Sequence, residues 1–375
     1  MLKNRFSLSI LLGLFFLNAL FAQLDNSGLE QKLQLDTGYN TPYTFNLRAL
    51  GFNKNNEYYN GINKGYTLFG YRIIPSIGWQ LNPKLKLEGG VFLQQDFGSP
   101  NLTYYQPYFN ILYSFDNNQL IFGNINGSIH HRLIEPLEDF ERLLFDNPER
   151  GLQFIRETDK LFLDAWIDWE RIIYPASDFK ELIAGGLVNH YKLINKPQKK
   201  LDLIYQFKGF HRGGQIDTIN NLPLIIVFNN SIGASYERNF GGKHFNSVKF
   251  EGHLLHFADI SPQPTAPYTE GYGYYLNASI SGKLGTVMLS YWRGDHFYAY
   301  NGGRIYQSVS TNFESRYFED VRELLILRIM NEFSLGKSTN LLLRFEPFWD
   351  FQNRKFEFSH AIYFNIFKTI PIGKK

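Results

Sequence analysis

Residues 160–173 read KLFLDAWIDWERII and alternate between two classes of side chain. Odd positions from Leu161 to Trp169 are all apolar, whereas Asp164, Asp168 and Glu170 fall on even positions, which they share with two aromatic residues. Successive side chains of a strand point to opposite faces, so one face is apolar and the other carries three carboxylates. A soluble sheet would bury the apolar face in a core, whereas a transmembrane barrel would turn it toward lipid.

The first residues predict export. Lys3 and Arg5 precede the apolar run SLSILLGLFFLNALF, and Ala22 supplies a small residue for cleavage, so we expect residues 1–22 to be a removable signal peptide. No later segment approaches 18 consecutive apolar residues, which excludes a helical membrane protein. The chain must therefore be secreted or be held in a membrane by strands.

The composition narrows the class further. The chain has no cysteine, which excludes disulfides, thiolate metal sites and a lipid-modified N-terminal cysteine. Without the two basic residues of the signal peptide, the formal net charge falls from +3 to +1, which gives no reason to expect nucleic acid as a partner. Aromatic residues make up 17% of the chain, including 35 Phe and 24 Tyr, as expected of a lipid-facing barrel with aromatic girdles.

Alternating segments of about ten residues or more recur along the whole chain. A clear pair is YRIIPSIGWQL and LKLEGGVFLQQ, which flank the turn sequence Asn82, Pro83 and Lys84 and together predict a hairpin. A first count yields fifteen strands, but a bacterial outer-membrane barrel normally has an even number. The segment RGLQFIRE, residues 150–157, supplies the missing strand, because with it the short turns all fall on one side of the membrane.

The pattern resembles the porin-like outer-membrane β-barrels of Gram-negative bacteria, over nearly all of the chain after residue 22. The resemblance implies an all-β fold, a transmembrane antiparallel up-and-down barrel of about 16 strands, within a range of 14 to 18, with short periplasmic turns and long extracellular loops. We expect a periplasmic N-terminal segment at 23–42, the barrel at 43–368 and a C-terminal tail at 369–375. The expected location is the outer membrane.

The strand parity predicts which charged side chains face the interior. Acidic and basic residues occur there in similar number, so we expect a polar, pore-lining surface without strong ion selectivity. The same charges are also explained by ion pairs within the wall. The predicted set is Arg48, Arg72, Lys86, Glu88, Asp164, Asp168, Glu170, Lys249, Glu251, His253, Arg328, Glu332, Arg344 and Glu346.

The sequence EPLEDFERLLFDNP, residues 135–148, breaks the alternation. Its apolar residues follow helical spacing between two prolines, so we expect a helix over 136–145 within a loop at 129–149. The helix either folds inward as a constriction or plug, which we favour, or packs outside as a cap. The residues assigned to it are Pro136, Glu138, Asp139, Phe140, Glu141 and Leu144.

These observations predict a passive channel for small polar solutes and not an enzyme, since none of the common hydrolase, metalloprotease or nucleotide-binding motifs occurs. His130, His131 and Glu135 suggest a metal site, but a hydrogen-bonded loop explains them better, so we expect no metal and no cofactor. Expected partners are outer-membrane lipid, small polar solutes and the outer-membrane assembly machinery. Whether the protein forms oligomers is left open.

Two rival functions follow from the same sequence. The first is a plugged barrel that serves in binding, adhesion or assembly and contacts a partner through its longer loops. The second is an outer-membrane hydrolase, for which the sequence offers only dispersed His and Asp side chains, because catalytic residues need not be adjacent in sequence.

Overall fold

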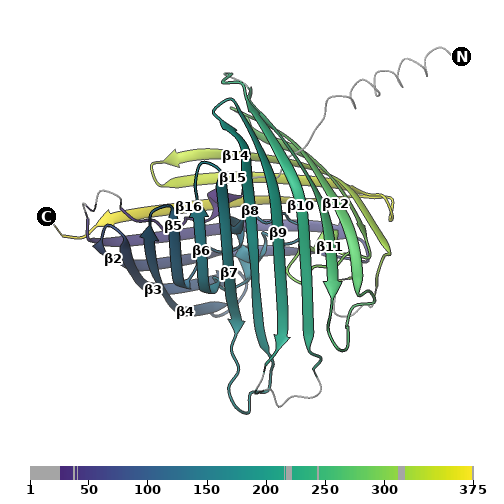
Figure 1. Cartoon of the computed structure of the whole chain (residues 1–375), viewed down its shortest axis with the longest axis horizontal. Helices are drawn as coiled ribbons and strands as arrows, with labels where there is room; N and C mark the ends of the chain where they lie inside the picture. The colour runs from purple at the N-terminus through teal and green to yellow at the C-terminus, as the bar shows by residue number, and fades with distance from the viewer. Residues whose placement is uncertain are drawn as a thin grey trace, which may run out of the picture.

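The protein is a closed antiparallel barrel in which β1 pairs with β2 on one side and with β16 on the other (Figure 1). The computed structural model describes residues 26–36, 39, 41–214, 216, 222–242, 245–310 and 317–373, and these contain sixteen strands. The prediction of a 16-stranded barrel is confirmed. The signal peptide expected at 1–22 lies outside the described residues. None of the helices in the described ranges is long and apolar enough to cross a membrane.

The strands follow one another around the barrel in chain order. Their bounds are β1 Tyr43–Tyr59, β2 Lys64–Asn82, β3 Leu85–Asp96, β4 Tyr104–Phe115, β5 Asn118–Asn124, β6 Arg150–Glu157, β7 Leu161–Arg171, β8 Glu181–Lys196, β9 Lys199–Gly213, β10 Ile225–Asn239, β11 Phe245–Asp259, β12 Glu270–Gly282, β13 Gly285–Asp295, β14 Val321–Gly336, β15 Thr339–Asp350 and β16 Lys355–Pro371. The described helices are the 3-10 turns η1 Ser27–Leu29, η2 Ser128–His131 and η3 Arg304–Tyr306, and the short α2 Arg142–Phe145.

Strand β7 shows how the period-2 pattern builds the wall. Asp164 and Asp168 are buried on the interior face, together with the aromatic Phe162 and Trp166. Ile167 belongs to the opposite face and is exposed, as expected of a side chain that meets lipid. The alternation of the opening sequence is therefore that of a membrane barrel.

Short turns and longer loops alternate around the barrel. The segment RGLQFIRE is strand β6, and residues 158–160 join it to β7 as a short turn, at the end of the barrel that the sequence predicts to be periplasmic. The longest connections, at residues 125–149 and 296–320, leave the strands at the opposite end, which the sequence predicts to be extracellular. Strand β16 extends beyond the expected barrel end at residue 368, because Pro371 still lies opposite Thr44 of β1.

The interior of the barrel is occupied by chain. Residues 125–149, which we call the plug, fold inward from the end of β5 and return to β6. The described part of the expected periplasmic segment, residues 26–36, runs along the plug: the Leu33 amide donates to Asn126 Oδ1 at 2.8 Å. Buried apolar side chains of the plug, such as Leu133 and Leu137, share one cluster with Trp292 of the wall.

The helix expected over 136–145 is wrong in extent, since only Arg142–Phe145 is helical. The reason is that tertiary partners take the hydrogen bonds that a helix would use. The Asp139 amide donates to the Asn301 carbonyl of the β13–β14 loop at 2.7 Å, and the Glu141 amide donates to Asp139 Oδ1 at 2.9 Å. A contact with another segment and a local side-chain bond thus replace part of the i to i−4 ladder.

Candidate functional site

The predicted pore-lining residues share the interior face, but they differ in exposure. Ten are buried, Lys86, Glu170 and Lys249 are partly buried, and Glu332 is exposed. Whether they line a conducting pore stays a prediction. The buried members are Arg48, Arg72, Glu88, Asp164, Asp168, Glu251, His253, Arg328, Arg344 and Glu346.

Several of these residues pair with one another. Arg48 Nη1 lies 2.6 Å from Glu88 Oε1, and Lys249 Nζ lies 3.1 Å from Glu251 Oε2. Arg72 instead stacks its guanidinium over the Phe92 ring, 4.7 Å from the centroid. The interior therefore contains wall ion pairs, and it also contains charges whose partners come from the plug.

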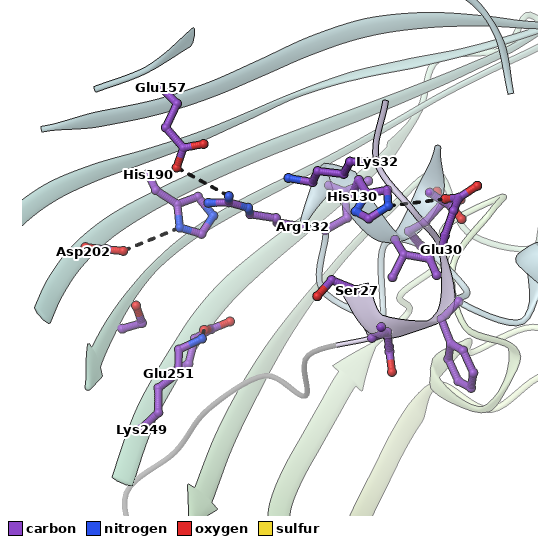
Figure 2. Close-up of a pocket in the computed structure, with 18 of the residues that line it drawn as sticks. Ser27, Glu30, Lys32, His130, Arg132, Glu157, His190, Asp202, Lys249 and Glu251 are labelled. Atoms are coloured by element: carbon purple, nitrogen blue, oxygen red, sulfur yellow. Dashed lines mark ion pairs between the residues drawn. The ribbon is translucent and has the colours of Figure 1, made fainter. Parts of the chain in front are cut away.

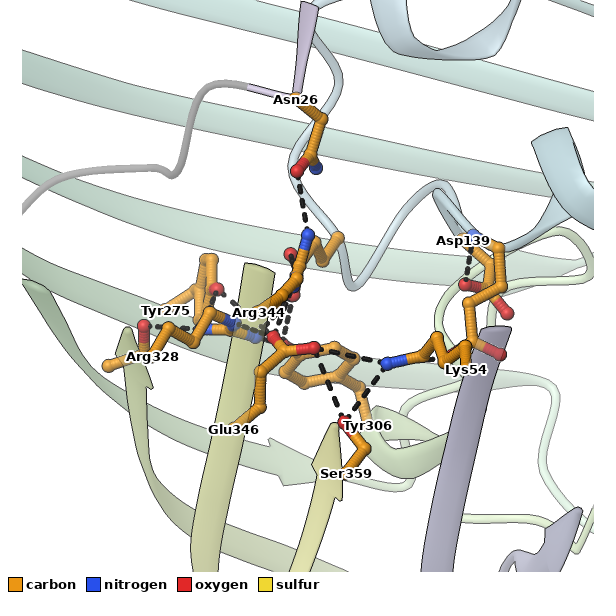
Figure 3. Close-up of polar contacts among 12 residues, drawn as sticks. Asn26, Lys54, Asp139, Tyr275, Tyr306, Arg328, Arg344, Glu346 and Ser359 are labelled. Atoms are coloured by element: carbon orange, nitrogen blue, oxygen red, sulfur yellow. Dashed lines mark hydrogen bonds and ion pairs between the residues drawn. The ribbon is translucent and has the colours of Figure 1, made fainter. Parts of the chain in front are cut away.

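The most extensive network joins β1, β14 and β15 to the plug (Figure 3). Glu346 lies between three cations, with Arg344 Nη2 at 2.6 Å, Arg328 Nε at 2.8 Å and Lys54 Nζ at 3.1 Å. The plug adds Glu135, which pairs with Arg328 and lies 3.1 Å from Arg344 Nη2. Sequence analysis placed Glu346 and both arginines at the interior, but it missed Lys54 and the role of Glu135.

The acidic residues of the helix expected over 136–145 contact different basic side chains of the wall. Glu138 Oε2 lies 2.6 Å from Lys208 Nζ, and Glu141 Oε1 lies 3.4 Å from Lys54 Nζ. Phe140 packs its ring against Arg344, whose guanidinium carbon lies 3.9 Å from the centroid. Acidic residues three apart in sequence thus point in different directions, which a regular helix would not allow.

His131 joins the plug to β7. Its Nδ1 lies 2.8 Å from Asp164 Oδ2, its Nε2 lies 2.8 Å from Glu149 Oε2, and its ring stacks on Trp166 with centroids 3.6 Å apart. Burial alone would lower the pKa of His131, but the carboxylates of Glu149 and Asp164 outweigh burial and raise the pKa to about 9. The protonated imidazole therefore links two carboxylates inside the barrel and holds the plug to the wall.

A chamber of about 810 Å³ remains beside the plug, toward the periplasmic end of the strands. Figure 2 shows Glu157, His190 and Asp202 extending from the wall toward the side on which His130 and Arg132 of the plug lie. Opposite charges pair across it: Arg132 Nη2 lies 3.6 Å from Glu157 Oε1. The chamber is lined by polar side chains of both charges, and plug residues from Ser128 to Phe140 form one side of it.

One interior array contains the residue types of a hydrolytic triad. His253 Nδ1 lies 2.8 Å from Ser231 Oγ, and His253 Nε2 lies 2.9 Å from Glu251 Oε1. All three side chains are buried on the inner wall, facing away from the lipid. Glu251 lines the chamber beside the plug, but none of the three side chains faces the surrounding bilayer, so this array is a poor candidate for chemistry on lipid at the outer face.

A second cluster lies at the exposed extracellular rim, and we call Tyr268, Asp295, His296 and Asp320 the rim site. His296 Nδ1 lies 2.5 Å from Asp295 Oδ1, and His296 Nε2 lies 3.6 Å from Asp320 Oδ1. Asp320 also accepts a hydrogen bond of 2.7 Å from the Tyr268 hydroxyl. Partial burial and then this hydrogen bond raise the pKa of Tyr268 above its ordinary value, so the phenol stays a donor.

The backbone and the ring packing both hold His296 in place. Its φ of 51° puts it in the left-handed region, which few non-glycine residues adopt and which histidine tolerates better than most. The Tyr268 ring meets the imidazole edge to face, with centroids 4.3 Å apart. Strained backbone of this kind is often found at functional sites.

The outer face of β13 descends from the rim site toward the membrane. From the rim inward its side chains are Asp295, Arg293, Tyr291, Leu289 and Val287, a gradient from charge through an aromatic ring to aliphatic groups. At about 3.4 Å per residue, Asp295 and Leu289 are roughly 20 Å apart along the strand. Such a gradient matches an amphiphile whose head group lies at the rim and whose acyl chains lie against the wall.

Sequence analysis missed the rim site. Asp295 and His296 are adjacent in the sequence GDHF, and that pair is the only local signal, whereas Asp320 lies at the far end of the β13–β14 loop and Tyr268 in the β11–β12 loop. The candidate metal residues His130, His131 and Glu135 do not converge: His131 binds carboxylates and Glu135 binds arginines. Loop residues that meet only in the folded protein carry no spacing that a single sequence reveals.

The fold is similar to those of solved outer-membrane proteins. OprD from Pseudomonas aeruginosa is 11% identical, with a TM-score of 0.50 over 95% of this chain and 99% of that chain. OmpT of Vibrio cholerae, in a form that lacks loop L8, is 9% identical, with a TM-score of 0.51 over 87% of this chain and 100% of that chain. Similarity at this identity supports an outer-membrane barrel and nothing more specific. No curated protein matches the sequence at a significant level.

A family model describes the sequence more specifically. The model of the lipid A 3′-O-deacylase type matches residues 35–375, which include every strand of the barrel. A deacylase is an enzyme, so the expectation that the chain is not an enzyme is wrong. That expectation rested on the absence of short catalytic motifs. A barrel whose catalytic residues are dispersed along the sequence does not need such motifs. The extent of the match shows that the chain belongs to the lipid A 3′-O-deacylase-type family.

Proposed function

We propose that the protein hydrolyses an acyl ester of a lipid A-type amphiphile at the extracellular rim of the barrel. The observation that carries the proposal is the Asp295–His296 pair, which stands at the exposed end of the amphipathic outer face of β13. In an acylated amphiphile the ester joins the polar head group to the apolar chains. We therefore place the ester beside His296 and Arg293, with the head group outward of it and the acyl chains along Tyr291 and Leu289.

His296 has the surroundings of a general base. The Asp295 carboxylate, with Oδ1 2.5 Å from Nδ1, favours a proton on that nitrogen, which leaves the Nε2 lone pair available. Nε2 lies 3.6 Å from Asp320, beyond hydrogen-bond range, so a water molecule can bind there. The base takes a proton from this water as its oxygen bonds to the ester carbonyl carbon. The carbon–oxygen ester bond then breaks, the proton passes to the leaving alkoxide, and a carboxylic acid and an alcohol result.

Arg293 can stabilise the negative charge that develops on the carbonyl oxygen. It lies two residues from Asp295 on the same face of β13, and Glu323 Oε2 holds its Nη1 at 3.3 Å. Tyr291 donates to the other oxygen of the same Glu323 carboxylate, Oε1, at 2.7 Å, so the guanidinium is positioned by a fixed partner. A cation at this point also attracts the anionic groups of a lipid head group.

The test uses the purified full chain in detergent micelles with lipid A, and mass spectrometry follows loss of an ester-linked acyl group. We expect His296→Gln to lower the rate about 100-fold or more, the usual contribution of a general base. His256→Gln is the matched control, because His256 is also an exposed wall histidine paired with an acid, Glu270. Loss of activity in the control alone would place the chemistry elsewhere on the wall. A wild-type protein that releases no acyl group would refute the proposed function.

A passive channel for small polar solutes is the second candidate. It is favoured by the chamber of about 810 Å³ at the periplasmic end and by the polar inner wall. Conduction needs a path past the plug, since buried side chains of the plug pack against the wall. Single-channel recording on the wild-type protein separates the two candidates: steady conductance supports the channel, and its absence together with acyl release supports the hydrolase alone.

A further inference from the structure

The Lys54, Arg328 and Arg344 cluster has more positive charge than its own wall neutralises. The three cations, which we call the cation trio, come from β1, β14 and β15, and Glu346 is the wall carboxylate that contacts all three. The remaining two negative charges come from the plug, through Glu135 and Glu141. We propose that the cation trio is a binding site for a small oxyanion with two negative charges, which the plug carboxylates occupy in this structure.

Several hydrogen-bond donors converge on the Glu135 carboxylate, as they would on a bound anionic ligand. Arg328 and Arg344 each contact its carboxylate, and the Tyr306 hydroxyl donates to Oε2 at 2.6 Å. Arg328 is itself held by Ser290 Oγ at 2.7 Å from Nη1. Two guanidinium groups and a phenol that converge on one carboxylate reproduce the donor set that proteins use for phosphate and carboxylate ligands.

The second plug carboxylate completes the charge balance. Glu141 lies 3.4 Å from Lys54 Nζ, which Ser359 Oγ also holds at 2.9 Å. A cavity of about 40 Å³ is lined by Lys54 and Arg328 of the trio and by Glu135 and Glu141 of the plug, so the site is not fully packed. Leaving the trio uncompensated would be strongly destabilising, because it would bury unpaired charge. A guest must therefore bring two negative charges when it displaces Glu135 and Glu141.

Access to the site is from the periplasmic side. Glu135 and Phe140 line the chamber of about 810 Å³ as well as the trio, so they separate the two spaces. Phe140 covers Lys54 and Arg344, with its ring centroid 5.2 Å from Lys54 Nζ. An anion that enters the chamber meets this segment first. The inference does not depend on the rim site, because the trio is buried on the inner face of the wall, whereas Asp295 lies on the outer face of β13.

The first experiment is calorimetric titration of the purified full chain with inorganic phosphate and, separately, succinate, at constant ionic strength in chloride. Glu135→Gln keeps the shape of the side chain and removes one competing charge. We expect it to bind at least one of the two anions about tenfold more tightly than wild type does, the effect of one charge-assisted hydrogen bond. Tighter binding of phosphate points to a tetrahedral guest, and tighter binding of succinate points to a dicarboxylate.

Two variants control the titration. Glu138→Gln removes another plug acid whose partners, Lys208 and Arg142, lie outside the trio, and it should bind as wild type does. Adding Arg344→Gln to Glu135→Gln should abolish the gain. If folded Glu135→Gln binds neither anion more tightly than wild type, the proposal is overturned.

The wild-type protein provides a test that survives misfolding of the variants. Phosphate should increase hydrogen exchange of residues 133–145 relative to chloride of equal ionic strength, because the guest displaces the plug carboxylates. Exchange that is the same in both salts would overturn the proposal. Failure of acyl release from lipid A would leave this result unaffected, so the two proposals fail independently.

Discussion

Glu135 Oε1 in the plug lies 3.1 Å from Arg344 Nη2 on β15, although 209 residues separate the two in sequence. This contact links the loop after β5 to the second-last strand across the barrel interior. Because β15 pairs with β16 and β16 with β1, the plug is tied to the region in which the barrel closes. We therefore expect changes in the plug to alter the stability of the wall as well as the path through the barrel.

Breaking the network from the wall side should destabilise the protein. Arg328→Gln removes a cation that pairs with both Glu135 and Glu346. Loss of one member of a buried ion pair lowers the free energy of unfolding by about 3–5 kcal/mol. Urea unfolding in micelles, followed by tryptophan fluorescence, measures the change. The matched control is Lys200→Gln, because Lys200 is partly exposed beside Glu237 and ion pairs open to solvent contribute about 1 kcal/mol or less. Equal losses for both variants would contradict the structural account.

The attachment of the plug through His131 should weaken at high pH. The pKa of His131 in the folded protein, about 9, exceeds its ordinary value of 6.5. The stabilisation is therefore complete below about 6.5 and is lost as the pH rises through about 9. Protonated imidazole quenches indole fluorescence, and His131 stacks on Trp166, so emission should rise with a midpoint near pH 9.

His131→Gln is the control for this titration, since the other tryptophans and the titrating tyrosines remain. The rise near pH 9 should vanish in the variant while the rest of the curve is unchanged. A wild-type midpoint near 6.5, the ordinary value, would show that Glu149 and Asp164 do not hold the charged imidazole.

Replacing residues 133–147 by a Gly/Ser linker of equal length should open the barrel. The strand ladder closes without these residues, so the variant should still fold and show the heat-dependent gel mobility of a barrel. Single-channel conductance should rise, and anions should be favoured, because the linker removes Glu135, Glu138 and Glu141 from the wall cations. Unchanged conductance in a folded variant would mean that residues 26–36 or the β13–β14 loop close the barrel by themselves.

The topology can be checked on intact cells. Cysteine at Asp159, in the β6–β7 turn, should resist a membrane-impermeant thiol reagent, whereas cysteine at Gln352, in the β15–β16 loop, should react. The chain has no native cysteine, so the labelling reports these positions alone. Rapid labelling at 159 together with protection at 352 would reverse the orientation of the barrel.

The sequence by itself determined the wall. Asp164 and Ile167 lie on opposite faces of β7 because side-chain direction in a strand has a period of two and depends only on local backbone geometry. The segment 150–157 was identified as a strand by parity, since both ends of such a barrel lie on the periplasmic side. These properties are repeated in strand after strand, so single irregularities do not obscure them.

Tertiary structure alone decided the plug and the sites. The apolar spacing of residues 136–145 predicts a helix, but Asn301 and Lys208, which are distant in sequence, take the hydrogen bonds and charges of that segment. The meeting of His296 with Asp320 at the rim likewise depends on how the β13–β14 loop returns to the wall. Contacts between segments far apart in the chain are set by the closed barrel, which brings every strand and loop around one interior, and no local period in the sequence encodes them.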